Sequence, residues 1–305
     1  MKNSICMCCG KALEDSSNYW HQSCIKKMFI SGAIPNINIQ EDEMINNNLE
    51  KGKTITGVQK KFSLDINVKR SRKTISVLNQ EYIIKTQQEN LNNIVYYEWI
   101  GMKLANICMI DTVENGIIKN NNDLFFITKR IDRDGNKKIP MEDFCQLSNT
   151  QTEYKYNGSY EGCYRNVINK YSYFSTIDKL KFYRIVLFSC IIGNTDMHLK
   201  NFSLYELDGK YQLTPAYDLV PVLMIFNQEE MALTINGKRK NITRKDFYQF
   251  AFSMNLDVKS IDYIHSDFMK AKIKMNEFIN STNLSEKEKE RFTKFINEKI
   301  KLLCE

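Results

Sequence analysis

The feature of this sequence that most restricts its fold is a strongly apolar segment that runs directly into a short polar one. Residues 177–192 include Phe182, Ile185 and Phe188, and the segment becomes nearly hydrophobic on all sides. A helix of that kind has to be buried, so the segment predicts the central helix of a helical domain. The segment that follows, residues 193–201, reads Gly-Asn-Thr-Asp-Met-His-Leu-Lys-Asn, and a buried helix would hold it rigidly.

The polar segment places Asp196 and Asn201 at the spacing Asp-x4-Asn. A carboxylate at the first position can orient and deprotonate a hydroxyl, and an amide oxygen at the second can hold a metal ion beside ATP. A second carboxylate, Asp218, follows in an apolar setting, and an upstream strand, Tyr-Ile-Ile-Lys, ends at Lys85. We therefore predict that these places converge on Mg-ATP.

The first half of the chain carries strand signals, and the second half carries helix signals. Three short apolar runs predict strands, at residues 75–78, 82–86 and 124–128. Residues 93–106 fit a helix, and Glu98 on that helix is the natural partner of Lys85. Residues 202–205 and 211–214 predict a hairpin turned at Asp208-Gly209.

Helices are predicted again from residue 243 onward. Thr243 with Asp246 and Ser285 with Glu288 resemble N-terminal capping boxes. Residues 150–163 read as a loop and a candidate interaction surface, because they combine tyrosines with glycines.

These signals predict an α+β, bilobal chain with a small β-rich N-lobe and a mainly helical C-lobe. We expect a short Cys-rich segment at residues 1–34, the N-lobe at 35–133 and the helical C-lobe at 134–305. The polar residues 35–53 read as a linker or loop between the first two parts.

The Cys-rich segment has a spacing that suits a metal ion. Cys6, Cys9, His21 and Cys24 form C-x2-C-x11-H-x2-C, and two close pairs of soft ligands can close a tetrahedral zinc site. Such a site would stabilise a segment too short to hold its own core. The alternative is a reduced, metal-free cluster on a short helical hairpin, and Cys8 is a further thiol that could substitute for a neighbour.

Bulk properties narrow the setting of the protein. Nine cysteines without a secretion signal argue against a disulfide framework. The N-terminus lacks a signal peptide and no apolar run reaches about 18 residues, so we expect a cytoplasmic protein without a membrane span. The net charge of +7 is spread along the chain, which favours a solvated surface over a nucleic-acid site.

Several motifs occur together in an order that resembles the HipA family of bacterial serine/threonine protein kinases, the toxins of HipA–HipB systems. The resemblance covers about residues 52–300, in the short HipT-like form that lacks the family's N-terminal subdomain. The motifs are Thr-Gly-Val-Gln-Lys-Lys at 56–61, the strand ending in Lys85, Thr-Lys-Arg-Ile-Asp-Arg at 128–133, Glu-Asp-Phe-Cys-Gln at 142–146, the polar segment 193–203, and Pro-Ala-Tyr-Asp-Leu at 215–219.

The resemblance implies roles for particular residues. Asp196 resembles the catalytic base, Asn201 and Asp218 the Mg2+ ligands, and Lys85, with Glu98, the phosphate-binding lysine. The remaining residues implied to lie at the nucleotide are Thr56, Gly57, Val58, Gln59, Lys60 and Lys61 of the phosphate loop, Lys129, Arg130, Ile131 and Asp132 of the hinge, and His198, Lys200 and Tyr217.

The resemblance also implies regulation and partners. The phosphate loop of the family carries serine autophosphorylation sites, and the matching hydroxyls here are Thr54 and Thr56. A phosphothreonine would repel the phosphates of ATP or eject the loop. The implied cofactors are ATP and Mg2+, while Zn2+ at the cysteine cluster is expected from the ligand spacing and not from the resemblance. The implied partners are a protein substrate such as an aminoacyl-tRNA synthetase, whose modification stops translation, and a HipB- or HipS-like antitoxin that binds DNA. We expect no membrane contact and no direct nucleic-acid binding by this chain.

Two departures and two alternatives accompany this interpretation. Threonines replace the family's serines, and Lys129 stands at a hinge position that is often acidic. The first alternative is a small-molecule kinase of similar fold, since Asp-x4-Asn and a later aspartate also serve small hydroxyl substrates. The second is a catalytically silent, ATP-responsive regulatory module, although Lys85, Asp196, Asn201 and Asp218 are all intact.

Overall fold

The computed structural model divides into two compact units. The first comprises Met1–Trp99 and Val113–Lys138, and the second comprises Ile100–Thr112 and Ile139–Glu305. The residues that the structure describes are 5–15, 18–29, 32–35, 61–69, 72–76, 81–87, 91, 93–120, 123–135, 137–226 and 228–305.

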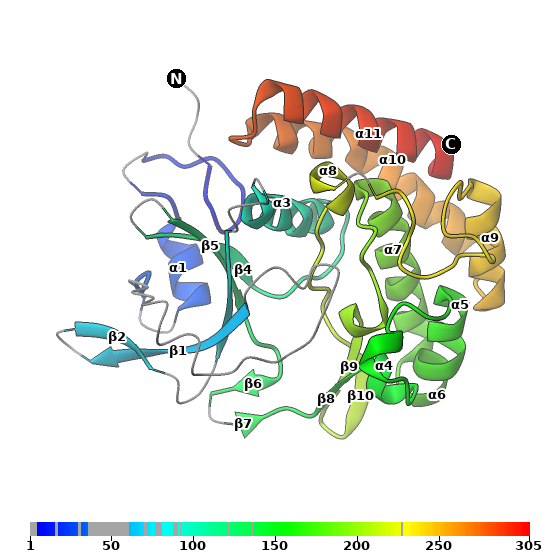
Figure 1. Cartoon of the computed structure of the whole chain (residues 1–305), viewed down its shortest axis with the longest axis horizontal. Coiled ribbons are helices and arrows are strands. Elements are labelled where there is room, and N and C mark those ends of the chain that lie inside the picture. Colours follow the sequence, from blue (N-terminus) through cyan, green and yellow to red (C-terminus); the bar gives the residue numbers. More distant parts are fainter. Residues whose placement is uncertain are drawn as a thin grey trace. The chain divides into compact units, whose positions relative to one another are not determined.

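The first unit is built around a five-stranded antiparallel sheet in the order β2-β1-β3-β5-β4 (Figure 1). Its strands are β1 (Lys61–Lys69), β2 (Arg72–Ser76), β3 (Tyr82–Thr86), β4 (Asn115–Asn120) and β5 (Asp123–Lys129). The unit also contains helix α1 (Gln22–Met28), the start of α3 (Ile94–Ile107), and a ribbon of β6 (Arg133–Asp134) and β7 (Lys137–Lys138).

Most of the predicted elements of this unit are present. The strand predicted at 82–86 is β3, and the strand predicted at 124–128 is extended by one residue at each end in β5. The helix predicted at 93–106 is α3, one residue later at both ends. β4 was not predicted, because Asn115, Gly116 and Lys119 interrupt the apolar pattern around its two isoleucines.

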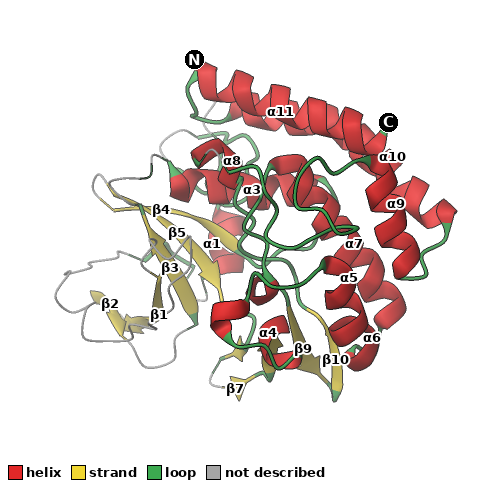
Figure 2. Ribbon diagram, turned by 45° about the vertical axis from the view of Figure 1, so that its right-hand side comes forward, coloured by secondary structure: helices red, strands yellow, loops and turns green. Residues whose placement is uncertain are grey.

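The second unit is mainly helical, and Figure 2 shows its helices and its small sheet. The small sheet has the order β10-β9-β8 and consists of β8 (Met141–Asp143), β9 (Ser203–Leu207) and β10 (Lys210–Leu213). The α-helices are α4 (Phe144–Leu147), α5 (Tyr160–Cys163), α6 (Asn169–Tyr171), α7 (Ser175–Ile192), α8 (Val222–Ile225), α9 (Arg244–Ser253), α10 (Val258–Ser281) and α11 (Glu286–Cys304). Short 3-10 or π turns occupy Thr152–Tyr154, Tyr164–Ile168 and Leu199–Asn201.

Helix α7 is the predicted central helix, and its second half is almost completely buried. It ends at Gly193, which has a left-handed backbone with φ +73° and donates its N–H to the carbonyl of Ser189. A Cβ atom at Gly193 would lie 3.0 Å from the Cβ of Leu223 and 3.1 Å from the ring of Phe295. Glycine therefore suits this position both in conformation and in size, and it ends the helix and redirects the chain into the polar segment.

Local turn and cap signals in the sequence match the second unit. Asp208 and Gly209 both have positive φ, which suits the two-residue turn between β9 and β10. The N–H of Thr243 donates to Asp246, and the N–H of Ser285 donates to Glu288, each at 2.9 Å. These two predicted capping boxes start α9 and α11.

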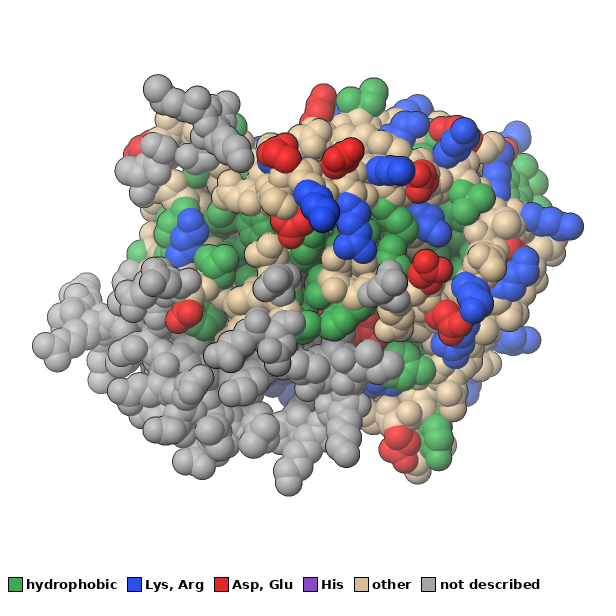
Figure 3. All heavy atoms as spheres, turned by 45° about the horizontal axis from the view of Figure 1, so that its top comes forward, with side chains coloured by type: hydrophobic (Ala, Val, Ile, Leu, Met, Phe, Trp, Pro, Cys, Tyr) green, Lys and Arg blue, Asp and Glu red, His purple; other side chains and the backbone are tan. Residues whose placement is uncertain are grey.

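The surface of the described residues is mixed in charge. Figure 3 shows basic and acidic side chains interspersed over the helical part on the face that it presents. Among the described residues, no helix combines the length and the apolar character that crossing a bilayer requires.

A buried histidine is part of the aromatic core of the second unit. His265 of α10 is 1% exposed, and its Nε2 lies 2.7 Å from the hydroxyl of Tyr183, whose ring stacks on Phe250. Burial lowers the pKa of His265 to about 4, and the positive charge of Arg244 contributes in the same direction. The folded protein therefore holds this imidazole neutral well below its ordinary pKa of 6.5.

We predict that His265 makes the protein less stable as the pH falls from about 6.5 to about 4. The unfolded chain binds a proton at this residue in that window and the folded chain does not, so acid favours unfolding by on the order of 3 kcal/mol. Urea unfolding at several pH values should show that His265→Gln removes this part of the slope. Parallel pH profiles for the two proteins would contradict the assignment.

Candidate active site

The polar segment after α7 folds into a loop that is tied together internally. The N–H of His198 donates to the carbonyl of Asp196 at 2.9 Å, and the N–H of Asn201 donates to the carbonyl of His198 at 3.0 Å. The side-chain nitrogen of Asn201 donates to the carbonyl of Asp196 at 3.0 Å. Because this bond uses the NH2 group, it does not occupy the amide oxygen of Asn201, which is the atom that could serve as a metal ligand.

Asp196 is 6% exposed, and its carboxylate is held by a tyrosine from a distant loop. The hydroxyl of Tyr156 donates to Oδ1 of Asp196 at 2.8 Å, and the ring of Tyr156 meets the ring of His198 edge-on. Arg239 in turn donates to the carbonyl of Tyr156 at 2.6 Å. This chain of contacts fixes the orientation of the carboxylate that the sequence predicts as the base.

The loop at 150–163 therefore has a role that sequence reasoning missed. It was interpreted as a candidate interaction surface, whereas the structure places Tyr156 against Asp196 and buries Lys155 to 2% exposure. The carbonyl of Lys155 accepts the N–H of Leu199 at 3.2 Å, so the two loops are also joined through the backbone. No pattern in the sequence distinguishes Tyr156 from the other tyrosines of this segment.

The segment around Asp218 is joined to the same loop. Asp218 has a left-handed backbone with φ +58°, which is uncommon for a residue with a side chain. The hydroxyl of Tyr217 lies 2.6 Å from Oγ of Ser203 and donates to the carbonyl of Lys200 at 3.2 Å. The Nζ of Lys200 pairs with Asp143 at 2.6 Å, which connects this corner to the start of α4.

In the first unit, Lys85 and Glu98 form a buried ion pair. Nζ of Lys85, at the end of β3, lies 2.5 Å from Oε1 of Glu98 on α3, and the two residues are 5% and 0% exposed. Nζ also lies 5.7 Å from the ring centre of Phe126. A buried pair of this kind holds a lysine in one position.

The predicted hinge residues follow β5. The N–H of Arg130 donates to the carbonyl of Glu81 at 2.8 Å. The carboxylate of Asp132 is bound by Arg130 through two hydrogen bonds and by Arg133 at 2.5 Å. Burial alone would raise the pKa of Asp132, but the two arginines outweigh it and hold the pKa below its usual range. The structure thus gives Asp132 arginine partners within its own unit.

The predicted residues fall into two groups, one in each unit. Lys85, Glu98 and residues 129–132 belong to the first unit, and Asp196, Asn201 and Asp218 belong to the second. Their convergence on one triphosphate stays a prediction. Thr54 and residues 56–60 of the predicted phosphate loop lie outside the described residues. Lys61 is the first residue of β1, and its backbone pairs with Lys85.

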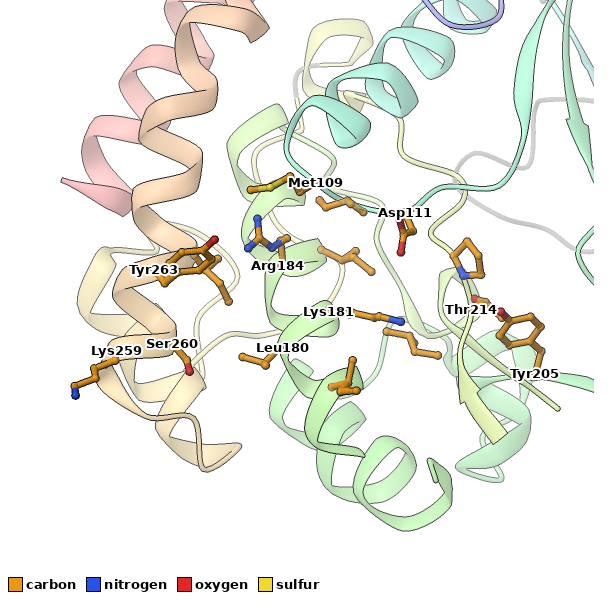
Figure 4. A pocket seen from close by; sticks show the side chains of 16 residues that line it. Met109, Asp111, Leu180, Lys181, Arg184, Tyr205, Thr214, Lys259, Ser260 and Tyr263 are labelled. Atoms are coloured by element: carbon orange, nitrogen blue, oxygen red, sulfur yellow. The ribbon is translucent and has the colours of Figure 1, made fainter. Parts of the chain in front are cut away.

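The described part of the second unit contains a cavity of about 520 Å³ (Figure 4). Its wall comes from the segment after α3, from α7 and α10, and from the end of β10, and it includes Asp111, Arg184 and Tyr263. None of the residues predicted to bind nucleotide or to act in catalysis lines it. This cavity is therefore not an argument for the phosphoryl-transfer site.

The four predicted metal ligands of the Cys-rich segment come together in the first unit. The ligand atoms of Cys6, Cys9, His21 and Cys24 all lie within 4.8 Å of one another. Cys8 is buried nearby and does not belong to this group.

Two solved structures show the fold that this chain resembles. Shewanella oneidensis HipA, in a complex with HipB and operator DNA, matches with a TM-score of 0.70 at 19% identity, over 86% of this chain and 70% of that chain. The Helicobacter pylori proinflammatory kinase CtkA matches with a TM-score of 0.56 at 18% identity, over 74% of this chain and 86% of that chain. The protein has the bilobal, α+β protein-kinase-like fold that its sequence predicts.

The family follows from the sequence comparisons. The protein-family model described as "HipA-like C-terminal domain" matches residues 54–281 of the sequence. The chain therefore belongs to the HipA-like C-terminal domain family. The "Serine/threonine-protein kinase toxin HipA" of Shewanella oneidensis is 27% identical over 61% of this chain, and the "Putative kinase Y4dM" of Sinorhizobium fredii is 30% identical over 59%. The match spans 47% of the length of each of these two relatives.

We predict that Glu98→Gln lowers the free energy of unfolding by about 3 kcal/mol or more, because it leaves the buried charge of Lys85 without its counterion. The matched control is Glu114→Gln, which breaks the exposed pair of Glu114 with Lys27 and should cost about 1 kcal/mol or less. Urea unfolding of both variants measures the difference. Equal costs would mean that the Lys85–Glu98 pair is not buried as described.

Proposed function

We propose that this protein is an ATP- and Mg-dependent serine/threonine protein kinase of the toxin–antitoxin type. The observation that carries the proposal is the geometry of the loop after α7, in which Tyr156 orients the carboxylate of Asp196 and the NH2 group of Asn201 donates to the backbone of Asp196. Membership of the HipA-like C-terminal domain family supports the same activity.

Each residue has one task in the proposed reaction. Asp196 accepts the proton of the substrate hydroxyl or orients that hydroxyl for in-line attack on the γ-phosphoryl group. Lys85, fixed by Glu98, binds phosphate oxygens of ATP. Asn201 and Asp218 offer an amide oxygen and a carboxylate, the hard ligands that Mg2+ prefers. Bound Mg2+ supplies charge neutralisation of the phosphates.

The substrate and partners are proposed by analogy with relatives. The Shewanella oneidensis relative is named a serine/threonine-protein kinase toxin, and its solved structure is a complex with HipB and operator DNA. We propose a HipB- or HipS-like antitoxin as the partner, and an aminoacyl-tRNA synthetase as the protein substrate whose phosphorylation inhibits translation. We propose autophosphorylation at Thr54 or Thr56 as the control of activity, in a protein that works in the cytoplasm.

Phosphotransfer should fall by a factor of about 10² or more in Asp196→Asn, because general-base assistance and substrate orientation are lost. The assay incubates the protein with γ-labelled ATP and cell lysate, and mass spectrometry maps Thr54, Thr56 and labelled proteins. Asp111→Asn is the control and should keep full activity, because the side chain of Asp111 lines the cavity of Figure 4 and is not assigned a task in the reaction. Normal phosphotransfer by Asp196→Asn would contradict the role of Asp196 as the catalytic base. Transfer of the label to small molecules and not to proteins would favour the alternative of a small-molecule kinase.

Tyr156→Phe should lower kcat for phosphotransfer by about 10- to 100-fold, because a hydrogen bond to a charged group contributes about 1.5–3 kcal/mol. The KM for ATP should change little, since phenylalanine keeps the ring contact with His198 and only the hydrogen bond to Asp196 is lost. Tyr154→Phe is the matched control, because Tyr154 is 51% exposed two positions earlier. Steady-state kinetics of the wild type and the two variants measure these effects. Equal kcat values for Tyr156→Phe and Tyr154→Phe would contradict the role of the Tyr156 hydroxyl.

A further inference from the structure

We infer that a Zn2+ ion bound by Cys6, Cys9, His21 and Cys24 fastens the Cys-rich segment along the outer edge of the five-stranded sheet. The inference goes beyond the proposed kinase function and does not depend on it. It rests on the ligand geometry, on the orientation of His21, and on the backbone bonds between the segment and β4.

The ligand atoms lie within 4.8 Å of one another, so small shifts bring them to the corners of a tetrahedral site. Sγ of Cys9 lies 3.3 Å and Sγ of Cys24 lies 3.9 Å from Nδ1 of His21. With Zn–S bonds of about 2.3 Å and Zn–N bonds of about 2.0 Å, ligand atoms at tetrahedral corners lie about 3.5–3.8 Å apart. Three sulfurs and one imidazole form a closed structural zinc set, so no position is left for a reacting water.

His21 presents the correct nitrogen to this group. Its Nε2 lies 3.0 Å from the carbonyl of Ala12, and a carbonyl can only accept a hydrogen bond. The proton of the neutral ring is therefore on Nε2, and Nδ1 has its lone pair toward the sulfurs. A histidine that donates its other N–H to a carbonyl is the usual second contact of a metal-bound imidazole.

Backbone hydrogen bonds also position the cysteine ligands. The N–H of Gly10 donates to the carbonyl of Cys6 at 2.8 Å, and Gly10 has φ +76°. This turn brings Cys6 and Cys9 to the same side of the chain. The N–H of His21 points to Sγ of Cys6 at 3.3 Å, a contact that stabilises a thiolate.

The residues next to the ligands are the ones that bind the sheet edge. β4 is the last strand in the sheet order. The N–H of Ile117 donates to the carbonyl of Met7 at 2.9 Å, and the carbonyl of Ile117 accepts the indole N–H of Trp20 at 2.8 Å. Met7 follows the ligand Cys6, and Trp20 precedes the ligand His21. A bound metal ion would therefore fix the positions of both residues that hydrogen-bond to Ile117.

The surface of β4 is shaped for this arrangement. A Cβ atom on Gly116 would lie 2.3 Å from the indole of Trp20, so only glycine leaves room for that ring. Trp20 packs on Phe29, with 5.5 Å between ring centres, and Phe29 packs on Tyr82, the first residue of β3. The hydroxyl of Tyr82 donates to the carbonyl of Met28 at 2.8 Å. The segment is thus connected to β3, the strand that carries Lys85.

The test is metal analysis of the purified full chain, together with hydrogen exchange. We expect one zinc per chain in the wild type, loss of zinc in Cys9→Ser and His21→Ala, and full zinc in the matched control Cys8→Ala. Removal of zinc from the wild-type protein with a chelator should accelerate exchange of the Ile117 amide at least tenfold and leave amides of α7 unchanged. Added Zn2+ should restore protection.

The outcomes that overturn the inference are equally direct. The zinc site would be excluded if wild-type protein from cells supplied with zinc contained no zinc. A disulfide between Cys6 and Cys9 would exclude it as well. Zinc retained by both ligand variants would exclude these ligands, and unchanged Ile117 exchange after zinc removal would exclude the fastening role. Both measurements are made without ATP, so they succeed or fail independently of the proposed phosphotransfer.

Discussion

The second unit depends on the burial of one helix. The apolar surface of α7 can leave water only inside a layer of other helices, and its end at Gly193 fixes where the chain emerges. The polar loop that follows then satisfies its own backbone groups, through the bonds among Asp196, His198 and Asn201. Chemistry on this loop is therefore positioned by hydrophobic packing beneath it.

In the first unit, an ion pair rather than hydrophobic packing positions a polar side chain. A charged lysine at the end of β3 is kept in place by a glutamate on α3, in surroundings from which water is excluded. Such a pair adds little net stability, because desolvation offsets much of the attraction, but breaking one partner is costly. The pair thus specifies a position more than it contributes free energy.

Much of this could be predicted from sequence, because the informative signals are local. A buried helix, a two-residue turn at Asp208-Gly209 and two capping boxes depend on neighbours within a few positions. β4 was missed because its pattern is interrupted, and it becomes a strand only by pairing with β5 and by accepting Trp20 in the space above Gly116. Tyr156 was missed because its contact with Asp196 joins residues that are 40 positions apart. Non-local contacts of single residues leave no periodic trace in a sequence.

The left-handed backbone of Asp218 has a consequence for how this position tolerates change. Chemical similarity ranks glutamate as the nearest replacement, since it keeps the carboxylate. Conformation ranks asparagine and glycine first, because these residues adopt φ near +58° more readily than longer side chains do. A survey of substitutions here would therefore separate two kinds of tolerance at one residue: asparagine preserves the shape of the chain, and only aspartate supplies both the shape and the charge.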